Sequence, residues 1–197
     1  MATDQLHPRA GDALIAVDVQ NDFLPGGSLA VADGDAVVPV LNAYIDVFRQ
    51  RRLPIYATRD WHPAGHCSFQ AQGGPWPPHC VAETGGAAFA PALNLPSDAT
   101  IVSKATHSDQ DAYSGFQGTD LAKRLRAQAV TRLFIGGLAT DYCVLNTVRD
   151  ALAEGFTVLL LEDAIRAVNV QPDDGEKALA DMGQRVAQPT TLTQVLA

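Results

Sequence analysis

The residue with the clearest chemical potential is Cys143, which follows a glycine turn. We expect a buried strand over residues 132–135, a tight turn at Gly136 and Gly137, and a helix that opens with Thr140 as its N-cap. Cys143 then takes the third helical position, where unpaired backbone N–H groups and the positive end of the helix dipole favour a thiolate. Most lone cysteines are small core residues, so this thiol alone does not establish a nucleophile.

Two charged residues stand at the ends of other expected strands. The continuous apolar run over residues 13–17 is typical of a strand buried in a parallel sheet, and it ends on Asp18. Lys104 directly follows a strand expected at residues 99–103. A carboxylate at such a place is costly unless it lies in a cleft or is paired, although Asp18 could equally cap the following turn. A cysteine nucleophile needs a base and a cation, and Asp18 and Lys104 could supply them.

The glycine turn could also stabilise an oxyanion. Gly136 and Gly137 let the main chain bend tightly, so that the N–H groups of Ala139 and Cys143 could point at one oxygen. The sequence has no G-x-S-x-G elbow, no phosphate-binding glycine loop and no G-x-G-x-x-G fingerprint. Cysteine chemistry is therefore favoured over serine or nucleotide chemistry.

A second group of residues has the types that bind metals. Asp60 and His62 are two apart, so in extended backbone their side chains point the same way, and His66 is near them. His79 follows a stretch stiffened by prolines and could complete an Asp/His/His site with open positions for water or substrate. Each of these residues taken alone is more typical of a polar surface or loop than of a ligand.

Apolar runs alternate along the chain with helical spacing. Strands are expected at 13–17, 54–58, 99–103, 132–135, 157–161 and 184–187, and helices at 37–52, 119–127, 140–152 and 173–182, with a turn or helix at 191–197. This alternation predicts an α/β fold: a three-layer α/β/α arrangement around a mostly parallel sheet of about six strands. Glu162 and Asp163 follow the fifth strand and are expected to accept hydrogen bonds from nearby backbone. The stretch 67–96, rich in Gly, Pro and aromatic residues, is expected to be a functional or mobile loop.

The expected strand ends bring the chemical residues together. Sites in open α/β sheets lie outside the carboxyl ends of the strands. Asp18, Asp60, Lys104 and the turn before Cys143 each lie at the end of a different expected strand. An active site is therefore expected along this edge of the sheet.

Length and charge restrict the partners. We expect residues 1–197 to form a single domain with a loose lead-in over 1–11. A net charge of −8, a pI near 4.9 and scattered basic residues argue against nucleic acid or an anionic membrane as partner. Three cysteines at irregular spacing fit reduced thiols, and no signal pattern or membrane-length apolar run is present in the sequence. A cytoplasmic protein with a small-molecule substrate is expected, and the sequence leaves open whether it forms a homo-oligomer.

Several motifs, in order, resemble the isochorismatase-like cysteine hydrolase family. They are VDVQNDF around Asp18, Lys104 after a strand, and GGLATDYCV around Cys143. Within this family, the stretches DWHP at 60–63, HCSF at 66–69 and WPPHC at 76–80 resemble the nicotinamidase branch. The resemblance extends from about residue 13 to 187.

The resemblance implies roles for these residues. Asp18, Lys104 and Cys143 correspond to the family's catalytic triad. The positions that correspond to ligands of one divalent metal ion, which could be zinc, iron or manganese, are Asp60, His62 and His79, with His66 a ligand in some members only.

The resemblance also bears on the substrate pocket. Positions that wall the substrate ring in the family correspond to Phe23, Trp76 and Tyr113. The Leu138–Ala139 bond corresponds to a cis peptide in the family. Tyr142 stands where other members carry histidine, so a different pocket rim is expected.

The activity that the resemblance implies is hydrolysis of nicotinamide to nicotinate and ammonia through a cysteine thioester, in NAD salvage, with pyrazinamide as a further substrate. The metal ion would hold the pyridine nitrogen, and Asp18 would carry the proton from Cys143 to ammonia. One alternative is a related cysteine hydrolase acting on another small amide or an isochorismate-like substrate, against which the metal set argues. The other is a non-catalytic ligand-binding protein of the same fold, against which the intact triad argues.

Overall fold

A computed structural model describes residues 6–197 of the 197-residue chain. The first five residues of the expected lead-in lie outside the described residues. The centre of the structure is one six-stranded sheet in the order β3-β2-β1-β4-β5-β6, with every neighbouring pair parallel. Its strands are β1 (Asp12–Val17), β2 (Ile55–Asp60), β3 (Thr100–Lys104), β4 (Arg132–Leu138), β5 (Thr157–Arg166) and β6 (Gln188–Thr190).

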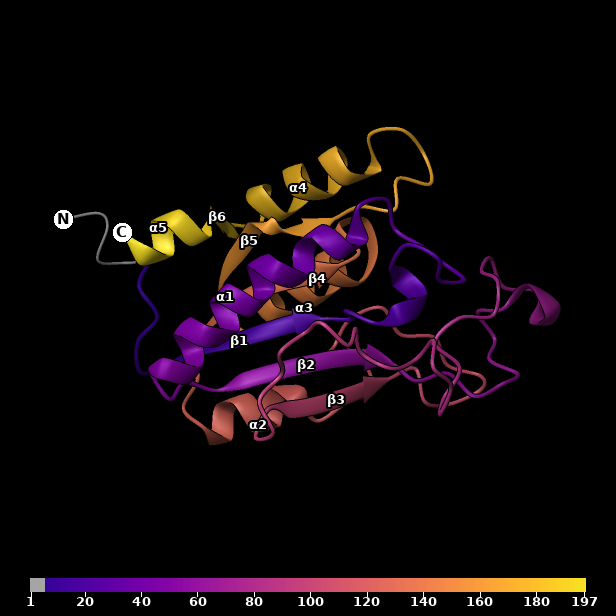
Figure 1. Ribbon diagram of the computed structural model, residues 1–197, viewed down its shortest axis with the longest axis horizontal. Coiled ribbons are helices and arrows are strands. Elements are labelled where there is room, and N and C mark those ends of the chain that lie inside the picture. Colours follow the sequence, from indigo (N-terminus) through magenta and orange to yellow (C-terminus); the bar gives the residue numbers. More distant parts are fainter. Residues whose placement is uncertain (1–5) are drawn as a thin grey trace.

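Helices cover both faces of this sheet (Figure 1). They are α1 (Val37–Gln50), α2 (Leu121–Ala127), α3 (Leu145–Ala153), α4 (Asp174–Gln184) and α5 (Leu192–Leu196). The apolar sides of α1 and α5 join one buried cluster, in which the rings of Phe48 and Phe134 meet edge to face at 5.1 Å. The apolar sides of α2, α3 and α4 join a second cluster, which contains Ile15 and Ile135. The predicted three-layer α/β/α fold is confirmed.

Burial on both faces explains why continuous apolar runs form the central strands. Every residue of β1 and of β4 is buried, because helices cover the sheet above and below them. The edge strand β3 is only partly buried, and Ile101 within it is 38% exposed.

The strand order sets the place of the site. The chain runs from β1 outward through β2 to β3, then crosses to β4 on the other side of β1 and continues outward to β6. The order therefore reverses between β1 and β4, and ligands of open α/β sheets bind at such a point. Asp18 follows β1 and the segment with Cys143 follows β4, so these two residues flank the reversal.

Two strand predictions need correction. The expected strand at 184–187 is wrong, because α4 continues to Gln184 and the last strand is Gln188–Thr190. The fifth strand does not end at residue 161 but continues to Arg166 across a register shift against β4. Within the extra length, Asp163 accepts hydrogen bonds from the Tyr44 hydroxyl (3.0 Å) and from the Leu192 N–H (2.8 Å). The expectation of a structural acceptor is thus confirmed for Asp163.

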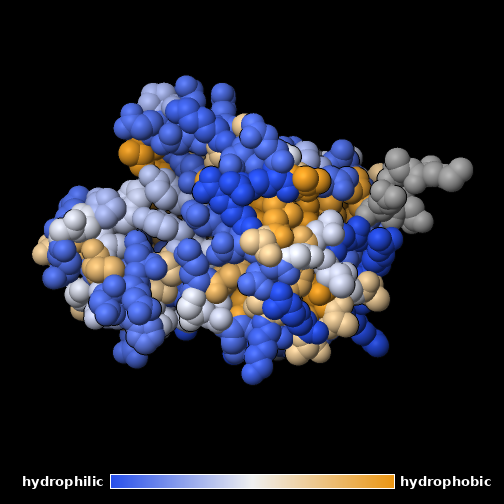
Figure 2. Space-filling model, turned by 180° about the vertical axis from the view of Figure 1, so that it is seen from behind, coloured by the Kyte–Doolittle hydropathy of each residue, from blue (hydrophilic) through white to orange (hydrophobic). Residues whose placement is uncertain are grey.

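Hydrophilic residues cover most of the face seen in Figure 2, with hydrophobic residues reaching the surface mainly in one area near its centre. Few large apolar side chains are exposed, the most exposed being Val186 at 81%. Among the described residues, no helix combines the length and the apolar character needed to cross a membrane.

Candidate active site

Three side chains from different strand ends meet at the carboxyl edge of the sheet. The Lys104 ammonium lies 2.9 Å from Oδ2 of Asp18 and 3.5 Å from Sγ of Cys143. It also donates a hydrogen bond to the carbonyl oxygen of Ala112 at 3.2 Å. All three side chains are buried, with Asp18 fully so. The structure therefore brings the predicted base, cation and nucleophile into contact.

Thr58 holds the Asp18 carboxylate from the neighbouring strand. Its hydroxyl donates to Oδ1 of Asp18 at 2.6 Å, and its carbonyl oxygen accepts the Asp18 N–H at 3.2 Å. Oδ2 contacts the Lys104 ammonium as an ion pair outside hydrogen-bond geometry. One carboxylate oxygen is thus fixed by a hydroxyl, while the other keeps a lone pair for a proton.

Burial and the ion pair act in opposite directions on the pKa values of Asp18 and Lys104. Desolvation raises the pKa of the Asp18 carboxyl, although the Lys104 ammonium and the Thr58 hydroxyl oppose the rise. Desolvation opposes the charge on Lys104, but the carboxylates of Asp18 and Asp60 outweigh it and hold the pKa of Lys104 well above its usual value.

The thiol does not behave as its place in the helix suggested. Desolvation raises the pKa of Cys143 well above the usual value for cysteine, with Lys104 opposing and Asp18 adding to the rise. Burial thus outweighs the helix end, which by itself favours a thiolate, and the result agrees with the expected need for a base. The thiol is protonated at rest and needs a base.

The nucleophile turn begins one residue earlier than expected. The N-cap is Ala139, with no side-chain cap bond, and Thr140 is the first residue of a π-helical turn, Thr140–Val144, that continues into α3. The Leu138–Ala139 peptide bond is cis, as the resemblance implied. Among the described residues, the Ala139 N–H has no hydrogen-bond partner, which suits the predicted oxyanion contact. Such π-helical turns are frequent at functional sites.

Gly137 allows β4 to approach β1 at this turn. Its φ is +129°, and a Cβ there would lie 2.1 Å from the carbonyl oxygen of Val17. Only glycine avoids both the clash and the unfavourable φ. The second glycine of the pair is therefore a packing requirement of the site.

Asp60, His62 and His79 form a group that can hold a metal ion. One ligand atom from each lies within 4.8 Å of the others, and all three residues are buried. His62 Nδ1 donates to the carbonyl oxygen of His79 at 2.9 Å, and His79 Nδ1 donates to that of Pro77 at 2.8 Å. In both residues the hydrogen bond at Nδ1 fixes the orientation of the ring and leaves Nε2 as the nitrogen that can bind a metal ion.

Burial also suits His62 to metal binding. Desolvation lowers the pKa of His62 to about 3, so its imidazole is neutral at physiological pH. Two imidazoles and a carboxylate fit a divalent ion of the first transition row.

His66 is close to this group but differs from it. Its ring stacks on that of His62 with 4.3 Å between centroids. Its Nε2 donates to the carbonyl oxygen of Gln110 at 3.1 Å, and its Nδ1 lies 2.7 Å from the Ser68 hydroxyl, from which it accepts. Because both ring nitrogens are engaged, His66 offers no free lone pair in this arrangement.

Lys104 connects the triad with the metal group, because its ammonium also pairs with Oδ1 of Asp60. The β2–β3 register places Asp60 beside Lys104. The two predicted sets of residues therefore form one site.

Aromatic rings surround the site. Phe23 contacts the ring of His79 at 5.7 Å, and the Trp76 indole N–H donates to the Tyr113 hydroxyl at 3.0 Å. Tyr142 lies edge-on to Trp76 with 5.0 Å between ring centroids, so it belongs to the same rim. Trp76, Tyr113 and Tyr142 are each half-buried, as expected for a rim open to a ligand.

The sequence did not single out the residues that hold the site together. Thr58 ends the expected second strand with a polar side chain after an apolar run, which is a weak signal. Gln20, whose side-chain amide hydrogen-bonds to the main chain of Asp60, belongs to the VDVQNDF stretch. Only Asp18 and Phe23 of that stretch were given roles. The functions of Thr58 and Gln20 depend on contacts between strands, which spacing along the chain does not reveal.

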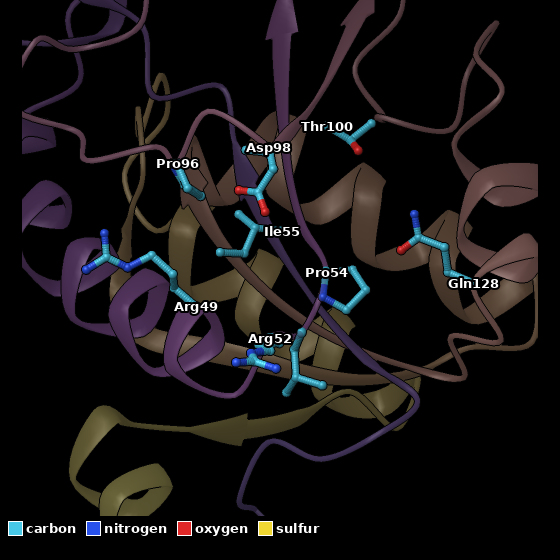
Figure 3. Close-up of a pocket in the computed structure, with 10 residues that line it drawn as sticks. Arg49, Arg52, Pro54, Ile55, Pro96, Asp98, Thr100 and Gln128 are labelled. Carbon is cyan, nitrogen blue, oxygen red and sulfur yellow. The ribbon is translucent and has the colours of Figure 1, made fainter.

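A separate hollow lies at the opposite end of the sheet (Figure 3). It has a volume of about 300 Å³ and is lined by the end of α1 and the starts of β2 and β3, including Arg49, Ile55 and Asp98. It contains neither a thiol nor a histidine among its lining residues. This hollow is not part of the candidate site.

Comparison with known proteins agrees with this geometry. Residues 12–194 match the isochorismatase domain family. The nicotinamidase of Escherichia coli (strain K12) is 40% identical over 201 residues, which cover 91% of this chain and 94% of that protein. The crystal structure of a pyrazinamidase of Pyrococcus horikoshii in complex with zinc has a TM-score of 0.89 at 51% identity and covers 92% of this chain and 99% of that one. PnC1 from L. infantum in complex with nicotinate has a TM-score of 0.88 at 36% identity, covering 95% and 96%. The chain therefore belongs to the isochorismatase family and, within it, to the nicotinamidase branch.

Proposed function

We propose that this protein hydrolyses nicotinamide to nicotinate and ammonia through a thioester on Cys143. The observation that carries the proposal is the position of the Lys104 ammonium, which contacts the Asp18 carboxylate and the Cys143 thiol on one side and Asp60 of the metal group on the other. The similarity to nicotinamidases and pyrazinamidases supports the choice of a small aromatic amide.

The first step is a proton transfer. The Cys143 thiol is protonated at rest, and the raised pKa of Asp18 makes its carboxylate a stronger base than an exposed aspartate. Asp18 takes the thiol proton, and the Lys104 ammonium, 3.5 Å from Sγ, stabilises the thiolate that forms.

The thiolate then attacks the carboxamide carbon. A C–S bond forms, and the N–H groups of Ala139 and Cys143 stabilise the negative oxygen. The C–N bond breaks as Asp18 gives its proton to the departing nitrogen, so that ammonia leaves and a thioester remains. Asp18 next takes a proton from water, whose oxygen attacks the thioester carbon, and the released sulfur regains a proton. The sum is nicotinamide plus water giving nicotinate and ammonia.

The residues that would hold one divalent metal ion are Asp60, His62 and His79, and the ion would be zinc, iron or manganese. When bound, the ion supplies a Lewis-acidic contact for the ring nitrogen of the substrate and so orients the ring. Phe23, Trp76 and Tyr113 would wall that ring and so exclude water from the carboxamide.

The direct test is ammonia release from nicotinamide by the purified protein, before and after chelation and again after metal return. We expect turnover that falls on chelation and recovers with metal. Turnover of pyrazinamide should follow the same pattern. If metal-loaded protein released no ammonia from either amide, another small amide would have to be the substrate.

The nucleophile is tested by Cys143→Ala, with Cys67→Ala as the matched control. The first variant should lose at least about 10³-fold in kcat while its thermal unfolding stays close to that of the parent. The second should retain turnover, because Cys67 is half-buried and is not among the residues that bond to Asp18, Lys104 or Cys143. Retained turnover in Cys143→Ala would exclude the thioester route.

We also take the whole chain as one domain, since both hydrophobic clusters lie against the same sheet. We infer that it works in the cytoplasm, because all three cysteines are free and such thiols persist in a reducing compartment.

A further inference from the structure

Gln20 is a fully buried polar residue in the loop after β1. Its side-chain amide makes two hydrogen bonds to the main chain of one residue, Asp60. The Asp60 N–H donates to Oε1 at 2.8 Å, and Nε2 donates to the Asp60 carbonyl oxygen at 2.8 Å. Nε2 also donates to the carbonyl oxygen of Ala87 at 2.9 Å. Both donor hydrogens and the acceptor of the amide are therefore used.

These bonds take the place of strand pairing beyond the end of β1. The pairing of β1 with β2 ends where Val17 faces Thr58, two residues before β2 itself ends at Asp60. On its other side Asp60 still pairs with β3 at Lys104. The Gln20 amide thus takes over the edge of β2 that β1 no longer covers, and the backbone of Asp60 is held from both sides.

The same loop holds the segment that carries His79. The Cys80 N–H, next along the chain, donates to Oδ2 of Asp22 at 2.7 Å. The Ala87 bond of Gln20 ties a later part of the 67–96 loop to the same place. The loop after β1 therefore connects the two chain segments that carry Asp60 and His79.

We propose that Gln20 is a positioning residue for the metal ion: it fixes the main chain of Asp60 so that the carboxylate meets the Nε2 atoms of His62 and His79. This inference rests on the proposed function for the identity of the ligands. None of the three hydrogen bonds of the Gln20 side chain goes to the Cys143 thiol, so Gln20 acts through the main chain that it holds. Partners that orient metal ligands typically change metal affinity about 10- to 100-fold when removed.

The test compares Gln20→Met with Asn42→Leu. Methionine is close to glutamine in length and volume but makes none of the three hydrogen bonds. Asn42, on α1, makes an equivalent pair of bonds to a loop, donating to the Ala92 carbonyl oxygen and accepting from the Asn94 N–H, each at 2.8 Å. Both substitutions remove amide bonds to main chain, but only Gln20 bonds to the main chain of a metal ligand, whereas Asn42 bonds to residues at the far end of the 67–96 loop from His79.

The measurement is the Zn²⁺ dissociation constant of each full-length protein by competition with a chromophoric chelator, with thermal unfolding of the metal-free protein alongside. We expect Gln20→Met to weaken Zn²⁺ binding at least about 10-fold and Asn42→Leu to leave it within about twofold, whatever each does to unfolding. Equal Zn²⁺ affinities in the two variants would overturn the inference, since Gln20 would then be structural only.

Two further outcomes are decisive. If the parent protein binds no Zn²⁺, the inference is overturned. If the parent binds Zn²⁺ tightly but does not hydrolyse nicotinamide, the proposed function is overturned, and the comparison of Zn²⁺ affinities still decides the inference. If Gln20→Met does not fold, Gln20→Glu carries the same comparison, because it keeps the acceptor toward the Asp60 N–H and loses the amide donors.

Discussion

The hydrogen bond from Thr58 to Asp18 offers a sharp test of how the base is tuned. Thr58→Val keeps the shape of the side chain and removes the hydroxyl that donates to Oδ1 at 2.6 Å. This bond favours the ionised carboxylate, so its loss adds to the rise that burial already imposes on the pKa of Asp18. Because the ionised form is the active base, activity is lost as the pH falls through that pKa, and the loss must begin at higher pH in the variant.

The size of the effect follows from the energy of the bond. Hydrogen bonds to charged groups contribute about 1.5–3 kcal/mol, and about 1.4 kcal/mol corresponds to one pH unit. The acidic limb of kcat/KM against pH should therefore move upward by at least about one unit. On that limb the variant should be at least about tenfold slower, and it should approach the parent on the plateau.

The assay is ammonia release from nicotinamide over a pH series, with Thr147→Val as control. Thr147 is also fully buried, but its hydroxyl oxygen accepts the Gly115 N–H at 3.1 Å and makes no hydrogen bond to Asp18. The control should lose stability without moving the limb. A Thr58→Val profile that superimposes on that of the parent would refute the assignment of Asp18 as the titrating base.

Other predictions concern the turn and the metal group. Gly137→Ala should lower the free energy of unfolding by about 2–5 kcal/mol in chemical denaturation, because the added Cβ meets the Val17 carbonyl oxygen at a positive φ; unchanged stability would mean that β4 can move away from β1. His62→Ala should weaken Zn²⁺ binding far more than His66→Ala, since both nitrogens of His66 are already engaged. Equal losses in a chelator competition would show that His66 turns to become a ligand.

The strands that the sequence predicted well are those buried on both faces. Residues 13–17 before Asp18 and residues 133–135 before the glycine turn are all apolar because helices cover the sheet on both sides there. The last strand was misplaced because its residues, Gln188–Thr190, are polar and mostly exposed at an edge, so that no apolar pattern marks them. The extension of β5 was missed because Glu162 and Asp163 interrupt its apolar run where the register shifts.

The sequence predicted those site residues that lie at or just after the ends of recognisable strands. Asp18, Lys104 and Cys143 follow apolar runs, and parallel strands bring their carboxyl ends to one edge. The contact between Lys104 and Asp60 could not be read from the sequence, because it depends on the register of β2 against β3. The raised pKa of Cys143 could not be read from the sequence for a related reason: the helix end is a local feature, whereas burial depends on everything packed around it.

The position of β1 in the sheet has a consequence for synthesis of the chain. The strand is paired on one side with β2, made soon after it, and on the other with β4, made only after β3 and α2. A nascent chain that has reached β3 therefore carries an open edge along β1, which is buried throughout in the finished fold, and open edges invite pairing with other chains. Addition of β4 closes that edge and delivers the thiol to Asp18 and Lys104 in the same event. Catalytic competence and protection from aggregation thus arise together, late in translation.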